Sequence, residues 1–333
     1  MTRLFACPRL VAALLLLGFS AGPYAVRAQQ PAAPRDTSFT VHSALVKARK
    51  QFPEISVARP PKPDNVRSRL ALTYCTLPTG RELKLDVFYP KARRKQRFPA
   101  VLIVHGGGWR SGDRLQHAPL AEQLAARGYV AVTAEYRLST EAKYPAAVQD
   151  LKTAIRWLRA NARRLPVDTA RVAVWGFSAG GQLAALIGTT NGEKLFETPP
   201  YASHSSSVQA VVDADGILAF IHPESGEGDD RKATSAATHW FGSPKTESAE
   251  LWQQASALSH ISAHTPPFLF INSGVERMHA GRDDFRRQLE AFGIYSEVQH
   301  FPGAPHPFVF FNPWFTPTLE YTVNFLDRMF KAQ

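Results

Sequence analysis

The 333-residue sequence has only two cysteines, Cys7 and Cys75. Cys7 lies in an N-terminal segment that is expected to be removed, which leaves Cys75 alone in the mature chain. A single cysteine excludes an internal disulfide and a cysteine-ligated metal site. The apolar residues around Cys75 indicate a buried, unreactive thiol.

Long hydrophobic runs are also missing beyond the N-terminus, where no stretch of about eighteen apolar residues occurs. We therefore expect no internal membrane-spanning helix. Residues 1–28 have the pattern of a secretory signal, in which Arg3 and Arg9 precede a short apolar run from Leu10 to Ala21. The sequence predicts cleavage after about Ala28 and a secreted or periplasmic bacterial protein without further membrane contact. An uncleaved membrane anchor is the alternative.

A basic array interleaved with aromatic residues is a third absence, although the chain carries a net charge of +11 from 39 basic and 28 acidic residues. The basic residues are scattered, with local clusters at Lys91–Arg97 and Arg156–Arg164. Neither cluster has the interleaved aromatic residues of nucleic-acid-binding surfaces. We expect a solvated basic surface and no nucleic-acid partner. Attraction to an acidic polysaccharide is the alternative interpretation.

The sequence is expected to divide into a signal segment, a leader and one large domain. Residues 29–66 are rich in proline, alanine and arginine and resemble a linker, with one short helix predicted at 43–51. Ordered structure is expected to begin near Arg69, within a catalytic domain that spans residues 67–333. The oligomeric state cannot be read from this pattern.

Strand and helix patterns alternate along the large domain. Residues 100–104 form a continuous apolar run, as expected of a strand buried on both faces of a sheet. Such alternation predicts an α/β fold with a mostly parallel sheet of about eight strands and helices on both faces. Residues 217–265 interrupt the pattern with glycines, charges and aromatics, and predict a lid-like insertion or a surface helix. The other expected strands are 70–77, 83–88, 129–134, the strand leading into Ser178, 208–212, 268–271 and 296–301, and the main helices are 115–127, 146–163, 284–292 and 316–329.

A serine flanked by glycines follows a short apolar strand and precedes a helix. The motif is Gly176-Phe-Ser178-Ala-Gly180, a G-x-S-x-G pattern in the strand–turn–helix context of a nucleophile elbow. Residues beside the serine must have almost no side chain because the turn is tight. Ser178 is therefore the candidate nucleophile.

A second glycine-rich motif, His105-Gly-Gly107-Gly108-Trp109, comes directly after the buried strand at 100–104. Glycines let backbone N–H groups approach a substrate oxygen that becomes negative during attack on an ester carbonyl. We expect Gly107, Gly108 and Ala179 to form an oxyanion hole. Trp109 is predicted either to line the acyl pocket or to pack in the interior.

A serine nucleophile needs a base, and an acid must orient that base. His306 follows the last predicted strand and is the favoured base over His300 and His279. The acid is expected after the strand at 268–271. Glu276 and Asp283 are near-equal candidates for it, and Asp284 ranks third.

These motifs together resemble the bacterial feruloyl/acetyl-xylan esterase branch of the α/β-hydrolase superfamily, and are similar to hormone-sensitive-lipase-like carboxylesterases. The resemblance covers about residues 80–330. It is carried by His105–Trp109, Glu135–Leu138, Tyr144–Asp150, Ala154–Leu158 and Gly176–Gly181.

The C-terminal part of the sequence also resembles secreted members that are thought to deacylate plant polysaccharides, through Phe270–Ser273, Pro305–Phe308 and Pro313–Phe315. One departure affects the acid: the Gly-x-x-Asp loop usual after the seventh strand of the family is replaced by Asn272-Ser-Gly-Val-Glu276.

The resemblance implies a secreted serine esterase that works through an acyl-enzyme, with no metal or organic cofactor. Its expected substrates are small-molecule or polysaccharide esters, above all acetyl or hydroxycinnamoyl esters of plant cell-wall polysaccharides. The alternatives are an exopeptidase of the same fold and a non-catalytic binding protein. The leader is too short for the propeller domain that the exopeptidases carry, and no triad member is plainly missing.

Overall fold

The computed structural model describes residue 2 and residues 36–91 and 95–331. Apart from residue 2, the predicted signal segment lies outside the described residues, as do residues 29–35 of the predicted leader. The centre of the described chain is an eight-stranded sheet in the order β2-β3-β5-β4-β6-β7-β8-β9. Its strands are β2 (Val66–Thr76), β3 (Glu82–Pro90), β4 (Phe98–Val104), β5 (Val130–Ala134), β6 (Val167–Phe177), β7 (Ala210–Ala214), β8 (Phe268–Asn272) and β9 (Ser296–His300).

Most of this sheet is parallel, as the sequence predicts. Strands β4 to β9 run parallel to their neighbours, whereas β2 and β3 form an antiparallel hairpin whose second strand pairs antiparallel with β5. Parallel strands direct their carboxyl ends to one edge of the sheet, where the loops that follow them meet. The loops after β4, β6, β7, β8 and β9 therefore share that edge.

The central strand β4 shows why the apolar run predicts burial on both faces. Val101 and Ile103 belong to one hydrophobic core, and Leu102 and Val104 belong to the other. Successive side chains of a strand point to opposite faces, so an unbroken apolar sequence fills both cores.

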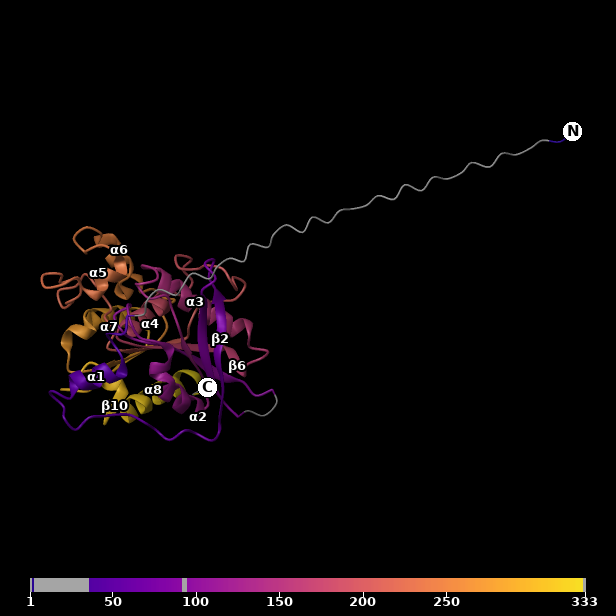
Figure 1. Ribbon diagram of the computed structural model, residues 1–333, viewed down its shortest axis with the longest axis horizontal. Coiled ribbons are helices and arrows are strands. Elements are labelled where there is room, and N and C mark those ends of the chain that lie inside the picture. The colour runs from indigo at the N-terminus through magenta and orange to yellow at the C-terminus, as the bar shows by residue number, and fades with distance from the viewer. Residues whose placement is uncertain (1, 3–35, 92–94, 332–333) are drawn as a thin grey trace.

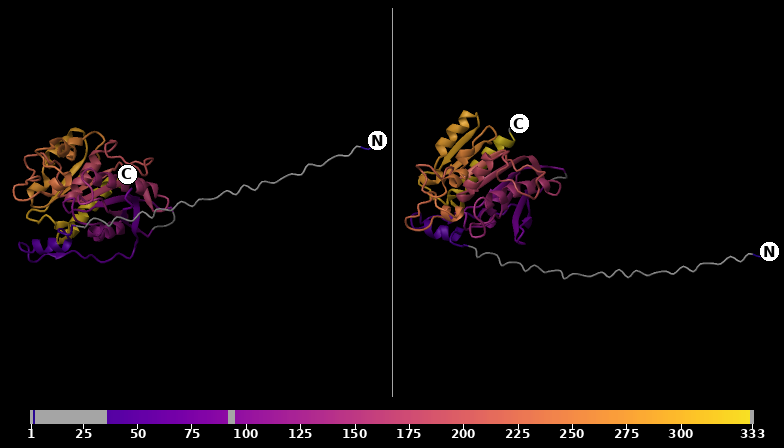
Figure 2. Two further views of the ribbon diagram at one scale, coloured as in Figure 1. Left: turned by 45° about the horizontal axis from the view of Figure 1, so that its top comes forward. Right: turned by 90° about the horizontal axis from the view of Figure 1, so that it is seen from above.

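Helices cover both faces of the sheet (Figures 1 and 2). Residues of α3, α4 and α7 contribute to one core, and residues of α1, α2 and α8 contribute to the other. The helices are α1 (Val41–Ala48), α2 (Ala118–Ala126), α3 (Ala146–Ala160), α4 (Ala179–Thr189), α5 (Ala236–Phe241), α6 (Ala249–Gln254), α7 (Arg282–Ala291) and α8 (Phe315–Phe330), and the short 3₁₀ helices are η1 (Arg114–His117), η2 (Ala257–His260), η3 (Glu276–His279) and η4 (Phe308–Phe310).

The described part of the predicted leader is ordered structure, so the expected start near Arg69 is wrong. Helix α1 buries Ala44 and Ala48 in the core that α2 and α8 line. Strand β1 (Ser56–Val57) pairs antiparallel with β10 (Phe311–Asn312). We call residues 36–58 the N-terminal arm, because they are bound to the body of the protein by these contacts. The prolines that make the predicted leader resemble a linker lie mostly outside the arm, which contains only Pro53.

The predicted insertion lies between β7 and β8 and contains α5, α6 and η2. Figure 1 shows α5 and α6 grouped at one end of the molecule, away from α2 and α8. Phe220, Trp240 and Trp252 of this segment are fully buried, and their rings contact one another. Phe220 and Trp240 also contact the ring of Trp109, which lies shortly after β4. The insertion is therefore anchored to the body by aromatic contacts rather than lying on the surface as an isolated helix.

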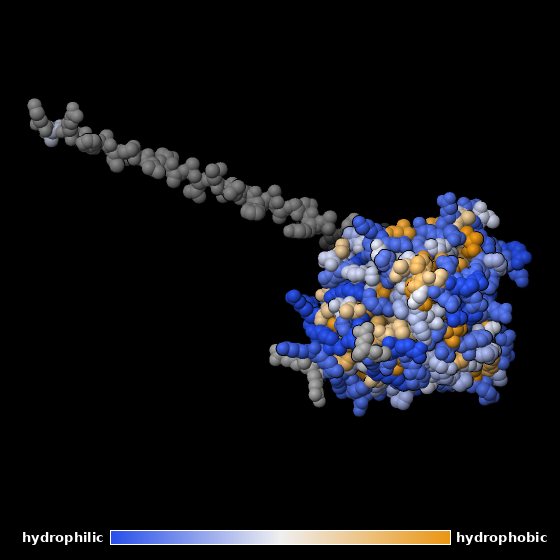
Figure 3. Space-filling view, turned by 180° about the vertical axis from the view of Figure 1, so that it is seen from behind, coloured by the Kyte–Doolittle hydropathy of each residue, from blue (hydrophilic) through white to orange (hydrophobic). Residues whose placement is uncertain are grey.

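The surface of the molecule is mainly hydrophilic on the face shown in Figure 3, where apolar residues form scattered patches. Among the described helices, none combines the length and the apolar character that crossing a bilayer requires.

Candidate active site

Ser178 lies at the sharp turn between β6 and α4, as its motif predicts. Its backbone has φ 57° and ψ −124°, in a region that residues with a side chain rarely adopt. The Ser178 N–H donates to the carbonyl of Ala214 at 2.9 Å, which holds the turn against β7. This geometry places the hydroxyl beyond the edge of the sheet, at the N-terminus of α4.

The glycines around this turn are required by their surroundings. A Cβ on Gly176 would collide with the carbonyl group of Gly180, and one on Gly180 would collide with the carbonyl oxygen of Val104. A Cβ on Gly181 would meet the carboxylate of Asp213. Strands β4, β6 and β7 therefore approach the elbow so closely that only glycine fits.

His306 brings the serine and a carboxylate together. Its Nε2 lies 2.8 Å from the Oγ of Ser178, and its Nδ1 lies 2.9 Å from the Oδ2 of Asp215. The imidazole comes from the loop after β9, and Asp215 comes from the loop after β7. Three side chains from three strand ends thus form a hydrogen-bonded series at the carboxyl edge of the sheet.

The acid assignment made from the sequence is wrong in this geometry. The carboxylate that contacts His306 belongs to Asp215, not to Asp283, Glu276 or Asp284. Asp283 is two-thirds exposed and pairs with Arg282, and Asp284 pairs with Arg287 and His222.

Glu276 is also exposed, on η3. The three candidates from the β8–α7 segment therefore have solvent or local cations as partners rather than the imidazole.

Two hydrogen bonds with backbone groups hold Asp215 in position. It is fully buried, its N–H donates to the carbonyl of Ile271 at 3.0 Å, and its Oδ1 accepts from the N–H of Ser273 at 2.8 Å. Its φ of 52° is another left-handed conformation at this edge. The sequence does carry a signal for it, since Asp213-Ala-Asp215-Gly directly follows an apolar stretch.

Asp213, two residues earlier, shapes the same turn. Its Oδ1 accepts from the N–H of Gly216 at 2.8 Å, while its buried Oδ2 has no hydrogen-bond partner among the described residues. Burial raises the pKa of Asp213 well above its usual range, and the nearby Asp215 adds to the effect. Sequence reasoning did not find this residue either.

The glycine loop after β4 lies against the elbow. Gly107 and Gly108 both have positive φ, at 120° and 59°, and a Cβ on Gly107 would collide with the backbone of Ser111. The Ser111 hydroxyl donates to the carbonyl of Gly107 at 2.9 Å. A Cβ on Gly106 would lie 3.1 Å from the Cβ of Ser178, so the loop passes directly beside the nucleophile.

Trp109 packs in the interior instead of standing free in a pocket. It is 4% exposed, its ring stacks on Trp240 at 4.8 Å, and its Nε1–H donates to Gln182 Oε1 at 3.0 Å. The amide of Gln182 in turn donates to the carbonyl of Ala255 at 2.9 Å. Trp109 therefore joins the glycine loop, helix α4 and the insertion into one rigid unit, which is the packing alternative that the sequence left open.

The sheet order, the strained serine turn and the hydrogen-bonded Ser178–His306–Asp215 series define a protein of the α/β-hydrolase class. Comparison with family models then gives the particular family. Residues 85–278 match the BD-FAE family model, and because this is more than half of the chain, the protein belongs to that family. The resemblance proposed from the motifs is therefore confirmed.

Individual relatives agree with this assignment. The chain is 29% identical over 259 residues to the esterase LipC of Mycobacterium tuberculosis, a match that covers 75% of this chain and 63% of LipC. A solved structure of esterase 2 from Thermogutta terrifontis with bound propionate superposes with a TM-score of 0.64 and 27% identity, covering 81% of this chain and 96% of that one. A bifunctional GH43-CE protein of Bacteroides eggerthii superposes with a TM-score of 0.66 and 26% identity over 79% of this chain and 38% of its own.

Proposed function

We propose that the protein is a serine hydrolase of carboxylic esters. One observation carries the proposal: His306 contacts the hydroxyl of Ser178 through one ring nitrogen and the buried carboxylate of Asp215 through the other. In this arrangement the imidazole takes the serine proton while the carboxylate fixes its tautomer and stabilises the charged ring. The names of the relatives, which are esterases, support the same reaction.

The first half of the reaction forms an acyl-enzyme. As the Oγ of Ser178 attacks the ester carbonyl, its proton passes to Nε2 of His306. The N–H groups of Gly107, Gly108 and Ala179 would hold the oxyanion, a contribution worth about 3–4 kcal/mol for one donor in comparable enzymes. His306 then returns the proton to the alcohol oxygen, and the alcohol leaves.

The second half repeats these steps with water. His306 removes a proton from the water that attacks the acyl group, and the tetrahedral intermediate collapses to release the acid and regenerate Ser178. Neither half uses a metal or an organic cofactor in this proposal.

For the substrate, we propose acetyl or hydroxycinnamoyl esters of plant polysaccharide rather than esters of long aliphatic acids. The insertion supports a limited acyl space, because a Cβ on Gly108 would lie 3.0 Å from the Cβ of Ala236 on α5. Trp109, Phe220 and Trp240 fill the interior behind it. The name of the Bacteroides eggerthii protein, a bifunctional GH43-CE, supports the polysaccharide side of the proposal.

The site of action is proposed to be outside the cytoplasm, as the signal pattern in residues 1–28 predicts. N-terminal sequencing of protein exported by a bacterial host would check this. A mature N-terminus near residue 29 is the expected result, and a retained N-terminus would contradict it.

The first test of the reaction is hydrolysis of p-nitrophenyl acetate by the wild-type protein and by Ser178→Ala. We expect turnover in the wild type and a loss of about 10⁴-fold or more in the variant, because the nucleophile is gone. Equal rates in both proteins would refute the proposed reaction.

A substrate panel of acetylated xylan, acetylated pectin, methyl ferulate and p-nitrophenyl decanoate tests the finer proposal. We expect the acetylated and feruloyl esters to be hydrolysed faster than the decanoate by at least about tenfold. A preference for the decanoate would contradict the proposed acetyl or hydroxycinnamoyl substrates, and it would leave the esterase reaction itself intact.

A further inference from the structure

The segment between β7 and α5 reaches the side of the candidate active site from which His306 comes. Within it, Gly226 approaches Arg277 of η3, since a Cβ on this glycine would lie 3.3 Å from the Cδ of Arg277. Arg277 in turn lines a cavity of about 680 Å³ together with Gly303, which belongs to the loop that carries His306. Glu227 directly follows Gly226 and therefore stands at the same side of the site.

The backbone around Glu227 is fixed by its neighbours. Its carbonyl oxygen accepts a hydrogen bond from Nζ of Lys245 at 3.1 Å. Gly228 has φ 75° and lies against Trp252, because a Cβ on this glycine would be 2.8 Å from the ring. Trp252 is linked through ring contacts to Trp109 beside the glycine loop. The Glu227 side chain therefore starts from a backbone that is held in place.

The carboxylate of Glu227 has one engaged oxygen and one free oxygen. Its Oε1 lies 3.4 Å from a guanidinium nitrogen of Arg277, whereas its Oε2 has no hydrogen-bond partner among the described residues. Unlike the Oδ2 of Asp213, this oxygen is not buried, and 15% of the Glu227 side chain is exposed. An acceptor that is fixed beside the active site and open on one side can bind a group of the substrate.

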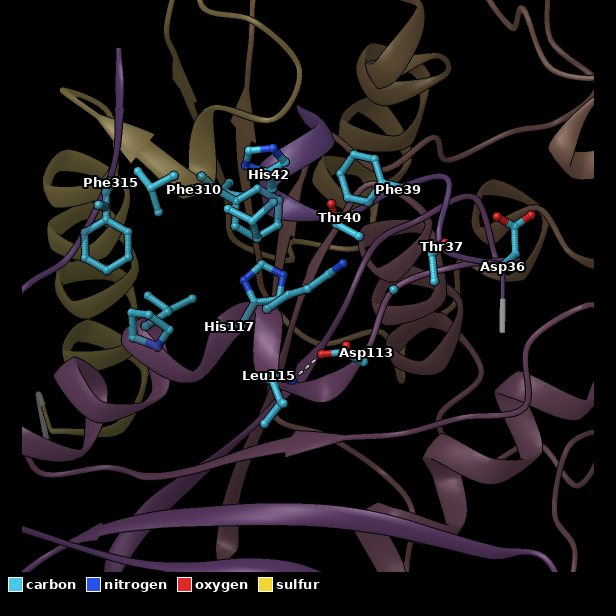
Figure 4. A pocket seen from close by; sticks show the side chains of 18 residues that line it. Asp36, Thr37, Phe39, Thr40, His42, Asp113, Leu115, His117, Phe310 and Phe315 are labelled. Carbon is cyan, nitrogen blue, oxygen red and sulfur yellow. Dashed lines mark hydrogen bonds between the residues drawn. The ribbon is translucent and has the colours of Figure 1, made fainter. Parts of the chain in front are cut away.

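The acidic residues in the cavity between the N-terminal arm and the body, which Figure 4 shows, are engaged instead. Asp36 forms an ion pair with Arg110, and the Oδ1 of Asp113 accepts from the N–H of Leu115 at 2.8 Å. These carboxylates hold the arm and the start of η1 in place. Glu227 differs from them because one of its oxygens makes no such contact.

The charges around Glu227 decide which ligand it suits. Burial raises the pKa of Glu227, and the charges of Arg277, His306 and Lys245 oppose that rise. Because these basic groups already surround the carboxylate, a cationic ligand would be repelled by them. An ionised carboxylate accepts hydrogen bonds and donates none. The surroundings therefore favour an uncharged donor, such as the hydroxyl group of a sugar.

The place of Glu227 near His306 puts it beside the alcohol half of an ester. In the proposed reaction His306 returns a proton to the alcohol oxygen, so the alcohol must lie against the imidazole as it leaves. The Ala236 end of the insertion approaches Gly108 and borders the glycine loop instead. Two parts of one insertion thus border the two halves of the substrate.

We propose that Glu227 is a specificity-determining residue, whose Oε2 accepts a hydrogen bond from a hydroxyl group next to the ester oxygen on the alcohol. Arg277 holds the other carboxylate oxygen and so fixes the direction of this acceptor. The inference rests on the proposed esterase reaction and adds the class of alcohol, a ring that carries a hydroxyl group beside the ester, as sugars do.

Two acetates with the same ring test this role. They are trans-2-hydroxycyclohexyl acetate and cyclohexyl acetate, which differ by one hydroxyl group. We expect wild-type kcat/KM to be at least about tenfold higher for the hydroxylated ester, because hydrogen bonds to charged groups are the stronger ones. In Glu227→Leu the ratio of the two kcat/KM values is expected to fall below about threefold. A ratio measured on one preparation does not depend on the fraction of the variant that is folded.

A matched control variant lies in the same segment. Asp229 is half exposed and pairs with Arg231, so Asp229→Leu should keep the wild-type ratio. Glu227→Gln retains the shape of the side chain and a neutral acceptor oxygen, and its ratio should lie between those of wild type and Glu227→Leu.

Three results would overturn the proposal. The first is a wild-type ratio below about threefold, and the second is an undiminished ratio in Glu227→Leu despite a high wild-type ratio. The third is faster hydrolysis of acetylcholine than of the hydroxylated acetate, which would make the carboxylate a site for cations. An equal loss of activity on both acetates in Glu227→Leu belongs to the second case and would mean that Glu227 acts through His306. If wild type hydrolyses neither acetate, the esterase reaction itself is refuted, and this inference with it.

Discussion

The loops after β7 and β8 each present acidic residues at the carboxyl edge of the sheet, yet only one contacts the imidazole. Asp215, after β7, is fully buried and accepts from Ser273 N–H and His306. Asp283, after β8, is two-thirds exposed and pairs with its neighbour Arg282. A carboxylate that is exposed to water and paired with a cation stabilises a protonated histidine only weakly. A buried carboxylate without an arginine or lysine partner stabilises the imidazolium strongly.

Two acidic residues near these loops, Asp213 at the end of β7 and Asp283 at the start of α7, have pKa values shifted in opposite directions. Burial raises the pKa of Asp213, and hydrogen bonding to Arg282 lowers the pKa of Asp283. The β8 loop still serves the β7 loop, because the backbone N–H of Ser273 holds Asp215 in place. The comparison therefore shows one loop that supplies the acid and another that supports it.

The largest expected effect is on turnover. Asp215→Asn should lower kcat/KM for p-nitrophenyl acetate by about 10⁴-fold, because the amide no longer fixes the productive tautomer of His306. Asp283→Asn and Glu276→Gln should change it by less than about threefold, since these side chains are exposed and do not contact the imidazole. A large loss in either control, with Asp215→Asn active, would restore the assignment that the sequence suggested.

The next effect is on stability and tests how tightly the β7 loop is packed. A Cβ on Gly216 would collide with the Asp213 carboxylate and the backbone N of Gln182, so Gly216→Ala should lower the free energy of unfolding by about 1–3 kcal/mol. Gly226→Ala, whose Cβ would meet only the flexible side chain of Arg277, should stay within about 0.5 kcal/mol. Urea denaturation measures both. Equal effects of the two variants would show that the loop can relax.

The smallest effect concerns pH. The folded protein keeps the proton on Asp213 at pH values where the unfolded chain has lost it, so this residue makes the protein less stable as pH rises above the ordinary aspartate pKa. Asp213→Asn removes that dependence and keeps an oxygen for the Gly216 N–H. Its melting temperature should exceed that of wild type by at least about 2 °C at pH 8, with the gap closing toward pH 4. A gap that does not vary with pH would count against a protonated Asp213.

The fold and two members of the hydrogen-bonded series could be predicted because their signals are local. Ser178 needs small neighbours at fixed spacings, and the glycine loop must follow a buried strand, so both are visible in short stretches of sequence. His306 could be predicted as the base from its position after the last strand. These residues now lie together as expected.

The acid could not be assigned in this way because its role depends on distance in space. Asp215 is an aspartate that follows a strand. Asp283 and Asp284 also follow a strand, but they pair with arginines. Burial and the absence of a local cation distinguish it, and both are tertiary properties. The packing of the N-terminal arm was missed for a similar reason, since a few apolar residues such as Ala44 and Ala48 do not stand out in a proline-rich segment.

The most direct test of the central claim is the proton NMR signal of the Nδ1–H of His306. An imidazole N–H bound to a buried carboxylate gives a resonance far downfield of ordinary amides, and its observation does not depend on the substrate. We predict this signal in wild type and in Asp283→Asn, and its loss in Asp215→Asn. Persistence of the signal in Asp215→Asn, or its loss in Asp283→Asn, would contradict the account.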